Sequence, residues 1–305
     1  MGNADAWMVI VNPKAGGGRG RREWPAISSL MNGSGLRFIS RFTEHKYHAT
    51  ELTVKAVNEG YRNIVAVGGD GTVHEVVNGI FLQKKVPVSE MCLAVIPVGG
   101  GSGWLRMPGI PQDYREAVRS LVEKCTVLQD VAKVSYYETK VRHTRYMANV
   151  AGLGYDAVLN MEYNNLKDEG RYDSGLHLRT AMRTFARFSP VHLDIKADGC
   201  SFYSGPVFSV AIGIGGKMDL TIIKEISKLR VVRNIKLLYE GNLYSVTDMF
   251  HSRCRKIEIE STPESRLQID GEAVGTSPFS FELQPGALRI VVAEDYSGST
   301  SSTIA

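Results

Sequence analysis

The sequence contains few cysteines and carries little net charge. Its 305 residues include four cysteines without paired spacing: Cys92, Cys125, Cys200 and Cys254. We therefore expect a reducing compartment, with neither a disulfide framework nor a zinc site. The formal net charge of +4 is too small to indicate a nucleic acid partner, although it permits contact with an anionic surface.

Long apolar runs are also missing from the sequence. No run approaches the length that spans a bilayer, and the chain reaches a polar loop at Asn12 after only a short strand. We therefore expect a cytoplasmic protein without a transmembrane segment or signal peptide. Its seven histidines show no ligand spacing, which favours structural or solvent-facing roles.

The first part of the chain alternates between strand and helix patterns. The predicted strands are residues 7–11, 37–42, 64–67 and 92–98, and the predicted helices are residues 21–31, 49–59, 72–82 and 114–124. This alternation is typical of an α/β domain in which helices cover both faces of a parallel sheet. We assign residues 1–128 to this domain.

Many short strands follow, which predicts a β-rich, sandwich-like second domain over residues 129–296. Its predicted strands are residues 131–137, 145–150, 191–197, 208–214, 220–223, 256–261, 266–269, 279–283 and 288–292. Its predicted helical insertions are residues 155–167, 176–188 and 229–239. Residues 297–305 read as a frayed tail.

The most informative segment is Gly68-Gly69-Asp70-Gly71-Thr72, which lies between a buried strand and a helix. Glycines let backbone N–H groups approach an anion, and a helix N-terminus adds unpaired donors. A carboxylate here repels phosphate unless it holds a cation or a proton, so Asp70 indicates chemistry. A turn in which Asp70 only caps the helix is the alternative.

Two more polar loops follow predicted strands: residues 12–18 and residues 97–103. The carboxyl ends of parallel strands share one edge of a sheet, where open α/β sheets bind ligands. The three loops together therefore predict a nucleotide site, although none matches a Walker A or dinucleotide spacing. A loose Gly-x-Gly-x-x-Ala match at residues 152–157 is better explained by tight packing.

Late in the chain, Asp270-Gly271 is a strong hairpin signal, and Glu272 follows it. Without context, the hairpin interpretation is favoured over a functional role. If the second domain leans over the nucleotide edge, Glu272 can accept a proton from an attacking hydroxyl group.

In this order and at these separations, the motifs resemble the diacylglycerol kinase catalytic-domain family. They are Asn12-Pro13 with Gly16, Gly68 to Thr72, Pro97-x-Gly99 and Asp270-Gly271-Glu272. The bacterial soluble lipid kinases, which are related to sphingosine kinases, look most similar. The resemblance covers nearly the whole chain and implies the fold shared by diacylglycerol kinases and NAD kinases.

The resemblance implies that ATP is bound in the first domain. The implied ATP-binding residues are Asn12, Pro13, Lys14, Ala15, Gly16, Thr43, Gly68, Gly69, Asp70, Gly71, Thr72, Glu75, Gly99 and Gly100. The implied reaction transfers the γ-phosphoryl group of ATP to a hydroxyl of a diacylglycerol-like or sphingoid lipid at a membrane surface. Glu272 would be the general base, Asp70 would orient Mg²⁺ or water, and Asp130 would extend this carboxylate network.

Two departures from the family pattern leave alternatives open. Gly100, Ser102 and Gly103 replace a threonine, an asparagine and an aspartate, and residues 213–219 are shorter than the glycine-rich, acidic segment of relatives. No magnesium ligand can therefore be carried over. NAD kinase, and a catalytically impaired lipid- or nucleotide-binding protein, are the alternatives. Exposed strand edges in the second domain would allow a homodimer.

Overall fold

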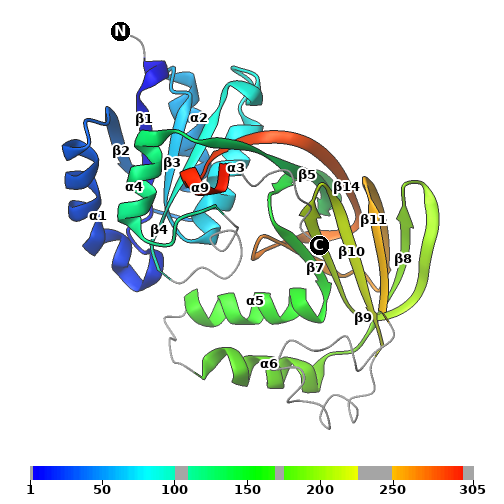
Figure 1. Ribbon diagram of the computed structural model, residues 1–305. Coiled ribbons are helices and arrows are strands. Elements are labelled where there is room, and N and C mark those ends of the chain that lie inside the picture. The colour runs from blue at the N-terminus through cyan, green and yellow to red at the C-terminus, as the bar shows by residue number, and fades with distance from the viewer. Residues whose placement is uncertain (1–2, 100–108, 169–174, 226–248, 298–305) are drawn as a thin grey trace. The chain divides into compact units, whose positions relative to one another are not determined.

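The computed structural model describes residues 3–99, 109–168, 175–225 and 249–297, which form two compact units (Figure 1). Unit 1 contains the described residues up to Val131 and those from Gln284 onward. Unit 2 contains the described residues from Ala132 to Leu283.

Unit 1 is built on a parallel sheet in the order β2-β1-β3-β4. Its strands are β1 (Trp7–Val11), β2 (Phe38–Phe42), β3 (Asn63–Gly68) and β4 (Cys92–Pro97). All five residues of β1 are buried, as are five of the six residues in β3 and in β4. Burial on both faces explains why these strands read as apolar runs rather than as alternating patterns.

Helices cover both faces of this sheet, as the sequence predicts. They are α1 (Ala15–Gly33), α2 (His48–Asn58), α3 (Asp70–Leu82) and α4 (Tyr114–Glu123), with short turns η1 (Asn3–Asp5) and η2 (Val88–Glu90). Ile27 of α1 and Val118 of α4 share one core with Val9 and Val65. Side chains alternate along a strand, so Met8 points to the other face, where α2 and α3 pack.

The start of α1 differs from the prediction, which placed it at Arg21. The helical segment begins at Ala15, but Gly16, Gly17 and Gly18 have φ angles of 59°, 66° and 86°. These values are left-handed, which glycine adopts without the Cβ clash that other residues suffer. The glycine run therefore makes a left-handed turn before the right-handed helix.

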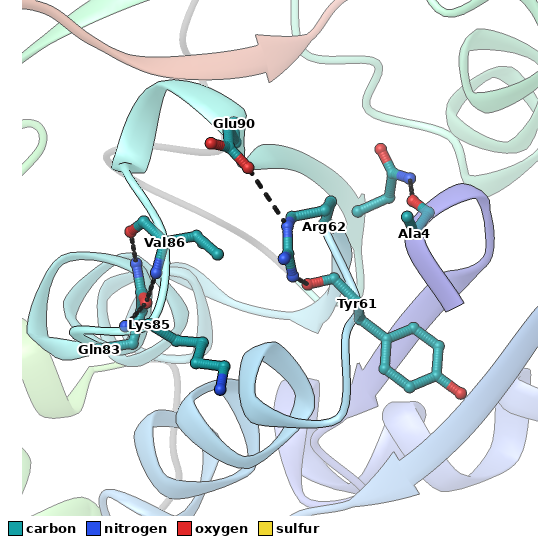
Figure 2. A network of polar contacts seen from close by, with 8 residues as sticks. Ala4, Tyr61, Arg62, Gln83, Lys85, Val86 and Glu90 are labelled. Carbon is teal, nitrogen blue, oxygen red and sulfur yellow. Dashed lines mark hydrogen bonds and ion pairs between the residues drawn. The ribbon is translucent and has the colours of Figure 1, made fainter. Parts of the chain in front are cut away.

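Gln83 closes the turn after α3 with its side chain (Figure 2). Its Oε1 accepts hydrogen bonds from the N–H groups of Lys85 and Val86, and its Nε2 donates to the Val86 carbonyl at 2.7 Å. Nearby, Arg62 lies 3.6 Å from a carboxylate oxygen of Glu90. These contacts fix the connection that leads from α3 to β4.

The end of strand β14 (Glu272–Val291) belongs to unit 1, because Arg289 and Ile290 pair in parallel with Cys92 and Leu93 of β4. A short helix, α9 (Glu294–Ser297), follows. The observed division thus differs from the predicted domains 1–128 and 129–296, since β14 runs from one unit into the other. Apart from Ser297, the predicted tail lies outside the described residues.

Unit 2 is β-rich and mainly antiparallel, which confirms the predicted fold class. Strand β5 (Thr126–Glu138) runs from unit 1 into unit 2. The further elements of unit 2 are β6 (Val141–Met147), β7 (Val150–Gly154), α5 (Tyr155–Asp168), α6 (Leu176–Arg187), β8 (Val191–Ala197), β9 (Cys200–Gly215), β10 (Lys217–Lys224), β11 (Met249–Cys254), β12 (Lys256–Thr262) and β13 (Arg266–Ile269). Inward-facing side chains such as Leu193, Ile212 and Phe281 form its apolar core.

The strand and helix predictions for unit 2 need one correction and one addition. The predicted strand 145–150 is wrong, because a bend at Ala148 and Asn149 separates β6 from β7. The structure also contains β11, which the sequence did not predict, and the predicted helix 229–239 lies outside the described residues. The tight-packing interpretation of residues 152–157 holds, since a Cβ on Gly154 would approach the Phe208 carbonyl oxygen to 2.5 Å.

In the described part of the chain, no helix has both the length and the apolar character needed to cross a membrane.

Candidate functional site

The first and second glycine loops of unit 1 are joined by the side chain of Asn12. Asn12 Nδ2 donates to Thr72 Oγ1 at 3.0 Å, and Asn12 Oδ1 accepts from the Lys14 N–H at 3.0 Å. The Asn12 N–H donates to the carbonyl of Val67 at 2.9 Å, so the loop leaves β1 beside the end of β3. Asn12 therefore fixes the conformation of its own loop and its distance from the start of α3.

The first and third loops meet through two glycines. A Cβ on Gly16 would lie 2.8 Å from Gly99 Cα, and a Cβ on Gly99 would lie 2.7 Å from Gly16 Cα. A Cβ on Gly20 would overlap the Asn12 carbonyl oxygen. Only glycine fits at these backbone contacts, which is a physical reason for the glycine content of both loops.

The second loop leads directly into α3. Gly69 occupies the N-cap position and Asp70 is the first helical residue, so the N-cap residue is Gly69 rather than Asp70. Thr72 is only 4% exposed, and the Val98 N–H donates to the Gly68 carbonyl at 3.0 Å. The first-turn N–H groups of a helix are free of intrahelical partners and favour an anion.

Two other predicted ATP-binding residues, Thr43 and Glu75, form hydrogen bonds that involve backbone groups of neighbouring segments. The Thr43 N–H donates to the Val11 carbonyl at 2.9 Å, which places Thr43 beside the first loop. The Glu75 carboxylate accepts from the N–H groups of Tyr47 and Ala49, both at 2.9 Å. Glu75 thus holds the start of α2, and its contact with ATP stays a prediction.

The remaining residues predicted around the nucleotide vary in their surroundings. Lys14 is exposed, whereas Ala15 is nearly buried. Asp130 Oδ1 accepts from the Gly286 N–H at 2.7 Å, so this oxygen ties β5 to β14 inside unit 1. Gly100, together with Ser102 and Gly103, lies outside the described residues.

In unit 2, the predicted hairpin is present and Glu272 directly follows its turn. Asp270 and Gly271 have φ angles of 49° and 90°, the left-handed pair typical of a two-residue hairpin turn. The partner of β13 is the start of β14, residues Glu272 to Thr276, rather than the predicted strand 279–283. The turn therefore fixes the backbone position of Glu272.

The Asp270 carboxylate clamps the bend between β6 and β7. It accepts hydrogen bonds from Ala148, Asn149 and Val150 N–H groups at 2.9, 3.0 and 3.0 Å, and Asp270 is only 8% exposed. Hydrogen bonds to a charged, buried acceptor are among the stronger ones in proteins. Sequence reasoning assigned Asp270 to the turn and did not find this clamp.

Helix α5 also supports this turn. Asn164 Nδ2 donates to the Gly271 carbonyl at 2.8 Å and to Asn160 Oδ1 at 2.8 Å, while the Gly271 N–H donates to Gln268 Oε1 at 2.7 Å. No motif in the sequence identifies Asn164 or Gln268 for this role. Both amides act on the turn that precedes Glu272.

A second carboxyl group, Asp156, lies at the start of α5, and this residue is exposed overall. Ser209 Oγ donates to Asp156 Oδ2 at 2.6 Å. Loss of water around the Asp156 carboxyl raises its pKa, and the hydrogen bond from Ser209 lowers it by less. Asp156 therefore binds its proton more tightly in the folded protein than in the unfolded chain.

One group of potential metal ligands occurs among the described residues: His45, His48 and Glu51. The two imidazole rings stack with centroids 4.4 Å apart and planes 9° apart. Their in-plane lone pairs therefore run side by side and do not converge on one ion. His48 Nδ1 also accepts a hydrogen bond from the Glu44 N–H at 3.0 Å, so this group is a poor chelator.

The segment 213–219 forms a tight hairpin between β9 and β10. Gly215 pairs with Lys217, and Gly216 has a φ angle of 72°. Asp219 pairs with Arg253, whose Nε lies 3.0 Å from Asp219 Oδ1. This carboxylate is therefore neutralised by a protein cation.

Comparisons with known proteins match both parts of the chain to protein-family models. Residues 6–134 match the diacylglycerol kinase catalytic domain, and residues 149–292 match the YegS C-terminal NAD kinase beta sandwich-like domain. A diacylglycerol kinase of Staphylococcus carnosus is 24% identical over 300 residues, which cover 90% of each chain.

Solved structures share the fold. A putative diacylglycerol kinase from Bacillus anthracis has a TM-score of 0.73 at 23% identity, covering 96% of this chain and 98% of that one. Yeast NADH kinase complexed with NADH has a TM-score of 0.57 at 10% identity, covering 99% of this chain and 90% of that one. At these identities, both likenesses support the fold alone.

Proposed function

The chain belongs to the diacylglycerol kinase catalytic domain family, and we propose that it transfers the γ-phosphoryl group of ATP to a hydroxyl group of a lipid. The observation that carries this proposal is the hydrogen bond between Asn12 and Thr72. It joins two glycine loops at the carboxyl ends of β1 and β3, where α/β sheets bind ligands. The lipid is diacylglycerol-like or sphingoid in this proposal.

The phosphates of ATP would be held by unit 1. The left-handed turn Gly16–Gly18 has no side chains that would obstruct an anion, and the N-terminus of α3 favours an anion electrostatically. Asp70, in the first turn of α3, provides carboxylate oxygens, which are suitable ligands for Mg²⁺. Bound Mg²⁺ would supply charge neutralisation between the phosphate oxygens.

We assign the general base to Glu272. As the lipid oxygen attacks the γ-phosphorus, Glu272 takes the hydroxyl proton, the bond from the γ-phosphorus to the bridging oxygen breaks, and ADP leaves. Asp270 and Asn164 are positioning residues in this scheme, because they hold the turn from which the base projects.

Glu272→Gln tests the proposal, with Glu282→Gln as a matched control on an exposed position of the same strand. We expect Glu272→Gln to keep ATP affinity and to slow turnover by about 100-fold or more. The measurement is transfer of label from γ-labelled ATP, with magnesium, to diacylglycerol, monoacylglycerol, sphingoid base, ceramide, phosphatidylglycerol or NAD. Label in NAD alone contradicts a lipid kinase, and ATP binding without transfer indicates an impaired protein.

A further inference from the structure

We propose that helix α6 docks unit 2 onto an anionic membrane. This proposal deepens the proposed function, on which it rests for the presence of a lipid substrate. It names the surface of the protein that would contact the bilayer, using only contacts within unit 2.

The inner face of α6 is firmly held by the rest of the unit. Thr184 Oγ1 donates to Glu162 Oε2 of α5 at 2.5 Å, and Tyr155 donates its hydroxyl to the Ala181 carbonyl at 2.8 Å. Thr180 and Thr184 are buried. These contacts leave the opposite side of the helix facing away from α5 (Figure 1).

The outward side of α6 carries two parallel strips of exposed residues. Residues four apart lie on the same side of a helix. The apolar strip is Leu178, Met182 and Ala186, and the basic strip beside it is Arg179, Arg183 and Arg187. Such a pair of strips is typical of a helix that lies in the plane of a membrane interface.

The apolar strip of α6 is exposed to water. Leu178 is 39% exposed and Met182 is 54% exposed, although transfer of either side chain from water to an apolar environment lowers the free energy. In the part of the chain that the structure describes, neither Arg183 nor Arg187 forms an ion pair. Both guanidinium groups therefore keep their charge available for an anionic partner.

An anionic bilayer fits both strips at once. Leucine and methionine can enter the boundary between headgroups and acyl chains, while each guanidinium binds a lipid phosphate with two parallel hydrogen bonds. To bind this face of α6, a second copy of the chain would need an acidic strip beside an apolar strip. Charge complementarity thus favours the membrane.

The docking helix is one helix away from the candidate base. Helix α6 packs on α5, and Asn164 of α5 holds the Gly271 carbonyl next to Glu272. A contact between α6 and the bilayer would therefore bring the turn that carries Glu272 toward the surface from which the lipid is taken.

Vesicle co-sedimentation tests the proposal. We expect stronger binding to phosphatidylcholine vesicles containing phosphatidylglycerol than to pure phosphatidylcholine vesicles, and weaker binding as salt is added. Arg183→Glu with Arg187→Glu should weaken binding at least about tenfold, and Leu178→Ser with Met182→Ser should weaken it several-fold. Because all four positions are exposed, the thermal unfolding temperature should change little.

Matched controls separate this effect from general charge or hydrophobicity. Lys84→Glu with Lys85→Glu makes the same change in charge on exposed positions after α3, and Val122→Ser removes another exposed apolar side chain. Both controls should bind vesicles like the unaltered protein. The proposal would be overturned if the α6 variants bound vesicles as strongly as the unaltered protein, or if binding did not depend on phosphatidylglycerol. It would also be overturned if the α6 variants lost self-association instead of vesicle binding.

The failure of the docking proposal and the failure of the kinase proposal can be distinguished by activity measurements. The α6 variants should phosphorylate a water-soluble short-chain acceptor at the unaltered rate and lose activity only on vesicles. If no lipid is phosphorylated while vesicle binding still depends on α6, the docking surface stands and the kinase proposal fails.

Discussion

At the scale of single residues, unit 2 contains two Asp-Gly turns with nearly the same backbone. Asp198-Gly199 has φ angles of 48° and 83°, and Asp270-Gly271 has φ angles of 49° and 90°. Both carboxylates accept backbone N–H groups, Asp198 from Arg255 and Lys256. Asp198 is exposed whereas Asp270 is buried, so the hydrogen bonds of Asp270 contribute more to the stability of the fold.

Asp270→Asn should destabilise the protein by about 2–3 kcal/mol, because the amide removes the charge and loses acceptor capacity toward three N–H groups. It should also slow phosphoryl transfer, since the turn before Glu272 loosens. Chemical denaturation and the transfer assay measure both effects.

Asp198→Asn is the matched control at an exposed turn of the same conformation. Its cost should stay below about 1 kcal/mol, and its transfer rate should be unchanged. Equal losses in the two variants would contradict the assignment of Asp270 as a clamp beside the candidate base.

At the scale of elements, the junction of β1, its loop and α1 depends on close backbone contact. Gly20→Ala places a Cβ against the Asn12 carbonyl oxygen, so the loop must move away from α1. We expect a loss of about 1–3 kcal/mol in stability and weaker ATP binding. Denaturation and titration with ATP provide the measurements.

Gly33→Ala on the same helix is the control, because a Cβ there meets no atom within 4 Å. It should leave ATP affinity unchanged and stabilise the helix by up to about 1 kcal/mol. Normal ATP affinity in Gly20→Ala would argue against a nucleotide site at this loop.

At the scale of the whole molecule, the chain leaves unit 1 within β5, after Val131, and returns to it within β14, at Gln284. Leu288, Ile290, Val291 and Val292 are buried on this return, and β14 pairs with β4. Unit 1 is therefore discontinuous in sequence, and its sheet needs residues from both ends of the chain.

A chain that ends at Leu283 should lose the fold of unit 1. Four buried apolar side chains at about 2 kcal/mol each amount to roughly 8 kcal/mol, which is comparable to the stability of a whole domain. Hydrogen exchange in β4 should become unprotected, and ATP binding should disappear. A chain that ends at Ser297 should behave normally, and protection in the shorter chain would contradict this account.

The sequence by itself determined the local features of this protein. Apolar runs such as residues 64–67 predict buried parallel strands, glycine loops predict close backbone approach, and Asp270-Gly271 predicts a hairpin. Each of these features depends on neighbours within a few residues. Hydrophobic periodicity and the residues typical of turns therefore predict it. The strand predicted over residues 145–150 failed because its break is imposed by Asp270, over a hundred residues away.

The tertiary structure alone decided which of these features work together. It joined Asn12 to Thr72, set Gly16 against Gly99, engaged Glu75 with the start of α2, and returned β14 to unit 1. It also gave α6 an outward face with two exposed strips. These outcomes depend on contacts between segments distant in sequence, and local patterns carry no information about such partners.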